Sequence, residues 1–320
     1  MGNEFRIGPI KRIPSISLSA FYGSHKAALK LELLNSPIGL SRPLYEPAIN
    51  RPGLAIAGFY NYFANKRLQV IGMAENSYLE SLHQEKQLGS FRSLLEHDIP
   101  GIVFSGNYTP SPEILLLANE AGVCIFRTSL MTMKFVNMAT IILENEFADR
   151  VSQHGCLIDV RGTGVLLRGS SGVGKSETAL GLVERGAALV ADDIVHLRNV
   201  GGELIGAAPQ ASRGYMEVRG LGIVNICQLF GMKSIRESKR LDFIVTLVHA
   251  DKQEELSRTG LDQKRVEILG VPVPMVELPV APGRDTARLV EVAIMQYLLK
   301  SMGVDMADEF NRNLLSTMKG

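Results

Sequence analysis

Apolar residues occur along this chain in short blocks, and the spacing within each block predicts a strand or a helix. In the first half, strands are predicted at residues 68–72, 101–104 and 123–126, and helices at 57–63, 75–83 and 112–121. A longer helix is predicted between residues 130 and 150, and the side chains expected to face a core are Met133, Val136, Ile141, Leu143 and Phe147. This alternation of strands and helices indicates an α/β domain.

Strand patterns dominate from residue 154 onward. A turn at residues 159–164 predicts a hairpin whose second strand contains Val165-Leu166-Leu167. A closing helix is predicted at residues 286–302, with Asp285 as its N-cap. We therefore expect an N-terminal α/β domain over residues 1–144 and a strand-rich domain over residues 145–320. Because the first ~25 residues show little periodicity, we expect a poorly ordered arm there.

The predicted strand at residues 165–167 leads directly into a phosphate-binding pattern. The pattern G-x-x-x-x-G-K-[ST] is matched by Gly169-Ser170-Ser171-Gly172-Val173-Gly174-Lys175-Ser176. Glycines let backbone N–H groups point at phosphate oxygens, and a helix predicted at residues 176–185 adds the positive end of its dipole. We expect Lys175 to reach the β- and γ-phosphates and Ser176 to hold Mg²⁺. The pattern therefore predicts a nucleoside triphosphate site.

A further apolar strand, Leu189-Val190-Ala191, ends in the acid pair Asp192-Asp193. Phosphoryl transfer needs a carboxylate near the metal and often one that takes a proton from the attacking hydroxyl. We expect the aspartate pair to supply both carboxylates. In most P-loop enzymes the acid-bearing strand follows the phosphate loop at a greater separation in sequence than the one between Lys175 and this pair. On sequence alone the weaker candidates are His154, Glu217, Arg258 and Arg284.

Composition narrows the function classes. The chain has 46% hydrophobic and 21% charged residues, which is typical of a globular protein, and it shows no membrane-spanning stretch and no secretory signal. Three scattered cysteines fit a reducing cytoplasm and are expected to be small buried hydrophobes: Cys124, Cys156 and Cys227. The net charge is +1 and no block of Lys and Arg occurs, so neither a nucleic-acid partner nor a membrane partner is expected.

In order and spacing, these motifs resemble bacterial HPr kinase/phosphorylase. The resemblance is carried by His154-Gly155, the phosphate loop with Glu177-Thr178-Ala179-Leu180, Ala191-Asp192-Asp193, and most specifically Glu217-Val218-Arg219-Gly220-Leu221-Gly222-Ile223. Residues 51–53 and 67–72 resemble the family's N-terminal domain, and residues 279–284 resemble its late loop. The likeness covers nearly everything after the first ~30 residues, a stretch long enough for two domains.

The resemblance implies a P-loop kinase domain like that of phosphoenolpyruvate carboxykinase. It implies a cytoplasmic, homohexameric enzyme of carbon regulation that phosphorylates a serine of HPr, the phosphocarrier of the sugar phosphotransferase system, with ATP or pyrophosphate. In the reverse reaction of the family, inorganic phosphate attacks the phosphoserine and releases pyrophosphate.

The resemblance also implies roles for individual residues. Lys175 and the loop amides bind phosphates, and Ser176 and Glu217 hold Mg²⁺. The aspartate pair provides the general base, for which we favour Asp193 although spacing does not separate it from Asp192. The family's other active-site positions correspond to His154 and Arg258, of which Arg258 serves mainly the phosphorolytic direction.

The chain departs from the family pattern at several positions. The late loop has Ala281 where a basic residue is usual and Asp285 where an Asn is usual. Losing a cation and adding an anion weakens attraction for a second phosphate, so we expect phosphorolysis to be weaker than kinase activity. The neighbours of Arg258 are also atypical, namely Leu256, Ser257 and Thr259. Ser170 replaces a common acid in the phosphate loop, which we expect to be tolerated because the loop binds through its backbone.

Two alternatives remain open at this stage. One is a P-loop kinase with another protein or a small molecule as acceptor, because the phosphate motifs recognise only the donor. The other is a non-catalytic protein that senses ATP. The presence of Asp192, Asp193 and Glu217 together argues against a sensor, which needs phosphate contacts but no base.

Overall fold

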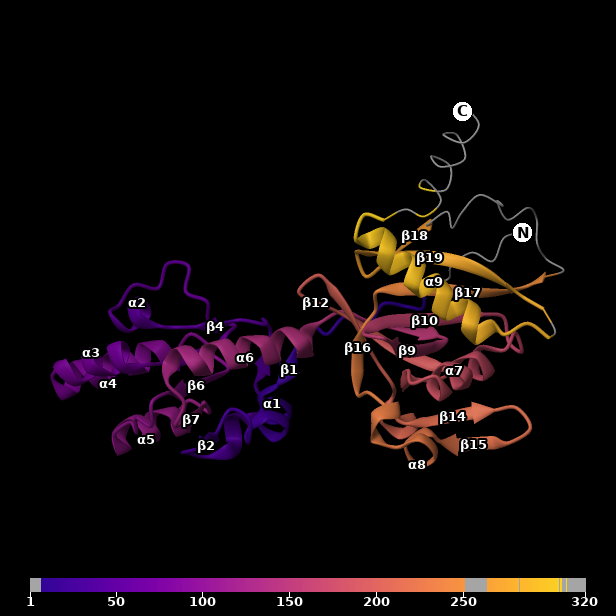
Figure 1. Cartoon of the computed structure of the whole chain (residues 1–320). Helices are drawn as coiled ribbons and strands as arrows, with labels where there is room; N and C mark the ends of the chain where they lie inside the picture. The colour runs from indigo at the N-terminus through magenta and orange to yellow at the C-terminus, as the bar shows by residue number, and fades with distance from the viewer. Residues whose placement is uncertain (1–6, 251–263, 282, 305, 307–308, 310–320) are drawn as a thin grey trace. The chain divides into compact units, whose positions relative to one another are not determined.

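The computed structural model describes residues 7–250, 264–281, 283–304, 306 and 309, and the chain divides into two compact units (Figure 1). One unit takes in residues 12–148, and the other takes in residues 1–11 together with 149–320. Across the described ranges, no helix is both long enough and apolar enough to cross a membrane. The two units are described separately below.

The unit of residues 12–148 is built on a five-stranded sheet. Its strands, in sheet order, are β2 (Leu31–Leu33), β7 (Cys124–Thr128), β6 (Gly101–Phe104), β5 (Leu68–Ile71) and β4 (Ile49–Asn50). β4 to β7 are parallel and β2 is antiparallel to β7. A small separate pairing joins β1 (Ile16–Ser17) to β3 (Pro43–Leu44), and η1 (Pro37–Ser41) precedes β3.

Helices cover both faces of this sheet. One core cluster combines strand residues with residues of α1 (Leu18–His25) and α6 (Thr132–Phe147). The opposite cluster combines strand residues with α2 (Gly53–Ile56), α3 (Met73–Ser81), α4 (Gln84–Leu95) and α5 (Pro112–Glu120). The prediction of alternating strands and helices is therefore confirmed for this unit, which has three layers.

Several local predictions for this unit are wrong. Residues 57–63 are turns rather than a helix, because α2 ends at Ile56 and Gly58 has a φ of +95° that a helix cannot continue. In α6 the buried residues are Phe135, Ala139 and Leu143, spaced by one helical turn, whereas Met133 and Ile141 are exposed. α4 was missed, and residues 18–25, expected to lack order, form α1 with Leu18 and Phe21 buried.

The other unit contains two main sheets. The six-stranded sheet has the order β11 (Ala188–Ala191), β9 (Cys156–Val160), β10 (Thr163–Gly169), β17 (Phe243–His249), β19 (Val271–Val280) and β18 (Lys264–Ile268). The four-stranded sheet has the order β16 (Ser238–Arg240), β13 (Glu203–Ala207), β12 (Ile194–Val200) and β8 (Arg150–His154). The strand-rich prediction for this half is confirmed.

The larger sheet is covered by helices on one face and by the smaller sheet on the other. α7 (Lys175–Glu184) and α9 (Thr286–Ser301) pack against the first face, together with residues of the hairpin β14 (Tyr215–Val218) and β15 (Gly222–Asn225) (Figure 1). The second face packs against the four-stranded sheet. Short helices complete the unit: η2 (Gln210–Ser212), α8 (Ile226–Phe230) and η3 (Met232–Ser234).

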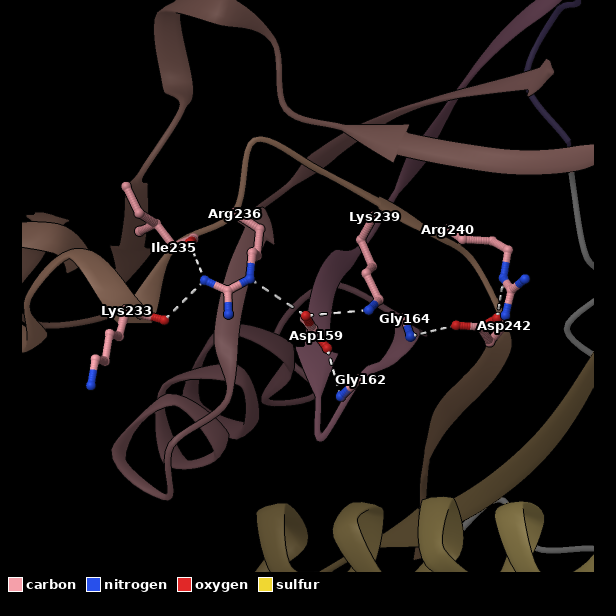
Figure 2. Close-up of polar contacts among 9 residues, drawn as sticks. All are labelled: Asp159, Gly162, Gly164, Lys233, Ile235, Arg236, Lys239, Arg240 and Asp242. Atoms are coloured by element: carbon pink, nitrogen blue, oxygen red, sulfur yellow. Dashed lines mark hydrogen bonds and ion pairs between the residues drawn. The ribbon is translucent and has the colours of Figure 1, made fainter.

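Buried carboxylates fasten the β9–β10 hairpin that leads to the phosphate loop (Figure 2). Asp159 accepts a hydrogen bond from Gly162 N (2.9 Å) and lies 3.3 Å from Lys239 Nζ and 3.6 Å from Arg236 Nε. Asp242 accepts hydrogen bonds from Gly164 N (2.8 Å) and Arg240 Nε (2.6 Å). Both carboxylates are mostly buried, so these charge-assisted bonds fix the hairpin against the segment that carries β16.

Candidate active site

The phosphate loop joins the end of β10 to the start of α7, as the sequence predicts. Its glycines Gly169, Gly172 and Gly174 have φ values of +146°, +76° and +95°. A Cβ at Gly169 would lie 2.5 Å from the carbonyl oxygen of Leu247 on the neighbouring β17. Only glycine therefore fits where the loop leaves the sheet.

Two side chains secure this loop from within. Val173 is 2% exposed and belongs to the core beneath α7. Lys175 Nζ donates hydrogen bonds to the loop carbonyls of Gly169 (3.1 Å) and Ser170 (3.0 Å). The ammonium group thus lies across the concave side of the loop, where a cation can reach phosphate oxygens.

A cleft of about 200 Å³ lies beside the loop. It is lined by Cys156, Ser171, Gly172, Gly174, Lys175, Ser176, Glu177, Asp192, Asp193, Glu217 and Arg219. The structure therefore gathers most of the sequence-predicted site residues in one place. Of the others, Gly169, Ser170 and Val173 shape the loop without lining the cleft, His154 lies next to Asp193 outside the lining, and Arg284 is exposed outside the cleft. Arg258 lies outside the described residues.

Asp192 is the polar centre of the cleft, and it is only 7% exposed. Its carboxylate accepts hydrogen bonds from Ser176 Oγ (3.3 Å), Glu217 N (3.1 Å) and Cys156 Sγ (2.6 Å). These donors come from α7, β14 and β9. One buried carboxylate thus holds three elements around the phosphate loop.

The Cys156 side chain is held as a protonated thiol. Burial raises the pKa of the Cys156 thiol well above its usual range, and the adjacent Asp192 carboxylate raises that pKa further. Both effects disfavour the thiolate because a second negative charge would lie next to the carboxylate in a dry environment. The thiol therefore acts as a hydrogen-bond donor to Asp192 and not as a nucleophile.

Asp193 differs from its neighbour in both conformation and exposure. Its φ is +63°, and its side chain is 77% exposed, so the carboxylate turns away from the buried network. The imidazole Nδ1 of His154, itself 83% exposed, lies 3.7 Å from Asp193 Oδ1. The main chains are joined by a hydrogen bond from Gly155 N to Asp193 O (3.0 Å). Folding therefore brings His154 to the acid pair, from a strand of the other sheet.

The β14–β15 hairpin supplies Glu217 and Arg219. Met216 and Val218 are buried in the core, so strand alternation turns Glu217 toward the cleft. The guanidinium nitrogens of Arg219 lie 3.7 and 3.8 Å from the point where a Cβ on Gly172 would be. Arg219 therefore lies beside the phosphate loop, at the cleft that both line.

The donor set of the cleft suits a hard cation bound together with phosphate. Four carboxylates line it, from Asp192, Asp193, Glu177 and Glu217, against the two cations Lys175 and Arg219. A polyphosphate entering this cleft needs a counter-charge, and Mg²⁺ takes one or two carboxylates plus phosphate oxygens rather than an all-protein cage. In the described part of the chain, no group of three or more His, Cys, Asp or Glu is placed to hold a metal ion.

Sequence reasoning missed three of the lining residues. Cys156 was expected to be only a small buried hydrophobe, and the pairing of β9 with β11 that brings it to Asp192 is a tertiary feature. Glu177 follows the phosphate loop directly, and Arg219 lies two residues after Glu217. Their closeness in sequence to these motifs could have indicated that both residues line the cleft.

Known proteins match this chain over nearly its whole length. The family model for the HPr serine kinase C-terminal domain matches residues 145–314, and the model for the HPr serine kinase N terminus matches residues 18–143. An HPr kinase/phosphorylase of Chloroherpeton thalassium is 40% identical over 314 residues, which cover 97% of this chain and 92% of that protein. One from Exiguobacterium sp. is 40% identical over 291 residues, covering 91% of this chain and 94% of that protein.

A solved structure of the Hpr(Ser) kinase/phosphatase from Coxiella burnetii is 31% identical, with a TM-score of 0.47, and it covers 50% of this chain and 97% of that one. The resemblance inferred from the motifs is thus confirmed by family models over both halves of the chain. This chain belongs to the HPr kinase/phosphorylase family, and it is an enzyme of the kinase/phosphorylase class.

Proposed function

We propose that this enzyme transfers a phosphoryl group from ATP, or from pyrophosphate, to a serine of the phosphocarrier HPr. The observation that carries the proposal is the convergence, beside the phosphate loop, of a buried carboxylate and an exposed one, Asp192 and Asp193. The relatives named HPr kinase/phosphorylase support HPr as the acceptor.

The donor end of the cleft binds the phosphates. The loop amides and the N-terminus of α7 stabilise negative charge, and Lys175 exchanges its two carbonyl hydrogen bonds for phosphate oxygens. Ser176 and Glu217 would hold Mg²⁺, and Asp192 fixes the Ser176 hydroxyl and the Glu217 main chain relative to each other. When bound, Mg²⁺ neutralises charge on the phosphoryl group during transfer.

The acceptor end of the cleft contains the group that takes the proton from the serine hydroxyl. Asp193, exposed and beside His154, accepts the proton of the HPr serine hydroxyl while that oxygen forms a bond to the terminal phosphorus. The bond from this phosphorus to its bridging oxygen breaks, and ADP leaves, or phosphate when pyrophosphate is the donor. In reverse, protonated Asp193 returns the proton to the serine oxygen as phosphate attacks the phosphoserine and pyrophosphate forms.

The late loop supports phosphorolysis weaker than the kinase activity, but only one of its two departures from the family pattern contributes. Asp285 accepts hydrogen bonds from Arg288 N, as the N-cap of α9, and from the guanidinium of Arg185. Its charge is therefore largely compensated, and the neutral Ala281 is the departure that weakens binding of a second phosphate.

The test uses Mg²⁺, γ-labelled ATP and HPr from the same cell. Label on an HPr serine is expected, and it is expected to be lost in Asp193→Asn protein. Label on another protein of that cell, with HPr unlabelled, would instead identify a different acceptor. We also propose a cytoplasmic homohexamer, as the family resemblance implies, and light scattering on the purified protein would measure its mass.

A further inference from the structure

No step of the phosphoryl transfer uses Cys156, although its side chain lines the cleft and is only 1% exposed. Cys156 is the first residue of β9, which lies between β11 and β10 in the six-stranded sheet. β10 leads into the phosphate loop, and β11 leads into the aspartate pair. Cys156 is therefore placed between the strand that carries the phosphate loop and the strand that carries the acids.

The main chain around Cys156 is fixed on both sides. Cys156 pairs with Leu167 of β10, and β9 also pairs with β11. Just before it, Gly155 N donates a hydrogen bond to Asp193 O (3.0 Å), and a Cβ at Gly155 would collide with the carbonyl oxygen of Leu167. The thiol therefore has a defined position relative to both the phosphate loop and the acid pair.

Of the three donors to Asp192, the thiol is the nearest. Cys156 Sγ lies 2.6 Å from Asp192 Oδ1, and Glu217 N lies 3.1 Å from Oδ2. Ser176 Oγ is farther away and is shared between the two oxygens, at 3.3 Å from Oδ1 and 3.5 Å from Oδ2. The thiol and the Glu217 amide thus hold one carboxylate oxygen each, and together they fix the plane to which the Ser176 hydroxyl donates.

The orientation of the Ser176 hydroxyl matters for a metal ion. A serine hydroxyl has one proton and two lone pairs. While the proton is donated to Asp192, both lone pairs are available to a cation in the cleft. If the carboxylate turned, the hydroxyl would lose its acceptor and would no longer be held with its lone pairs toward the cation. The orientation of Asp192 therefore controls how well Ser176 serves as a metal ligand.

We propose that Cys156 is a positioning residue, whose thiol fixes the Asp192 carboxylate and thereby keeps the Ser176 hydroxyl oriented for Mg²⁺ bound with the nucleotide. The inference rests on the function proposed above, in which Ser176 holds the metal. It requires a hydrogen-bond donor at residue 156. An alkyl side chain there would fill space but would leave Asp192 Oδ1 without its nearest donor.

Calorimetric titration with ATP tests the inference without any acceptor protein. The affinity for ATP is measured in Mg²⁺ and in EDTA, and the ratio of the two is the gain due to the metal. Cys156→Ala and Cys156→Ser both remove the sulfur, but only serine keeps a donor. The gain is expected to fall roughly fivefold or more in Cys156→Ala and to stay within about twofold of the unsubstituted enzyme in Cys156→Ser, since only alanine removes the hydrogen bond to a charged acceptor. The affinity in EDTA is expected to be unchanged in both variants.

Cys124→Ala is the matched control. Cys124 is also a fully buried cysteine, but it lies on β7 in the other unit of the chain. Its removal should lower the stability toward urea, because it leaves a small cavity, without changing the gain due to Mg²⁺. Loss of stability alone would thus be separated from loss of positioning.

Three results would overturn the inference. They are a full gain from Mg²⁺ in Cys156→Ala, an equal loss in Cys156→Ala and Cys156→Ser, which would assign Cys156 to packing alone, and an equal loss of ATP affinity in EDTA, which would show a disturbed phosphate loop. If the unsubstituted enzyme itself binds ATP no better with Mg²⁺, the proposed metal site fails and this inference fails with it. If that enzyme does gain from Mg²⁺ and Cys156→Ala keeps the gain, only the role of Cys156 is refuted.

Discussion

Substituting the two adjacent aspartates one at a time should separate two functions of the cleft. Asp193→Asn removes the proton acceptor without disturbing the fold, because the side chain is 77% exposed and Asn tolerates the φ of +63° found there. Asp192→Asn removes the charge of a buried acceptor that receives hydrogen bonds from Ser176, Glu217 and Cys156.

The two substitutions should affect different quantities, catalysis for Asp193→Asn and stability with ATP binding for Asp192→Asn. For Asp193→Asn, kcat should fall by about 10²- to 10⁴-fold, the usual contribution of a general base, with the KM for ATP little changed. The free energy of unfolding should change by less than about 0.5 kcal/mol, as for other surface substitutions. Asp192→Asn should cost roughly 1–3 kcal/mol of stability, because charge-assisted hydrogen bonds are weakened, and should also raise the KM for ATP.

Steady-state phosphorylation of HPr at varied ATP, with urea unfolding of the same proteins, measures both effects. The reasoning is refuted if Asp193→Asn retains kcat within tenfold of the unsubstituted enzyme. It is equally refuted if Asp193→Asn loses as much stability as Asp192→Asn, because the exposed carboxylate would then belong to the structural network.

Three further outcomes are expected. Gly169→Ala should abolish nucleotide binding and lower the melting temperature, because its Cβ would lie 2.5 Å from the Leu247 carbonyl; an unchanged ATP-induced thermal shift would contradict this. Cys156 should resist alkylation by iodoacetamide at pH 8.5, since burial and Asp192 raise its pKa and hold the thiol protonated below that pKa; mass spectrometry should detect faster labelling once the folded state is lost in urea. Ala281→Lys should increase pyrophosphate release from phosphorylated HPr at fixed phosphate, while equal rates would show that the late-loop cation is irrelevant.

Local sequence patterns predicted much of the N-terminal unit but not all of its helices. β5, β6 and β7 are short apolar blocks bounded by turn residues, and such strands are recognisable because both of their faces are buried. The orientation of α6 was predicted less well, because several of its apolar residues are exposed and only packing shows which side meets the sheet. α4 was missed because its polar residues obscure an apolar face that is defined by Phe91, Leu94 and Leu95.

At the site, the sequence by itself determined the parts that are contiguous in the chain. The strand, glycine loop and helix around Lys175 follow from local backbone requirements, and the hairpin turn at residues 161–162 follows from left-handed conformations that favour glycine. Tertiary structure alone decided which of the adjacent aspartates is buried, because that depends on the donors that β9, α7 and β14 bring to Asp192. It also decided that His154 meets Asp193, since this contact requires the pairing of β8 with β12, and long-range strand pairing is not encoded in any local window of sequence.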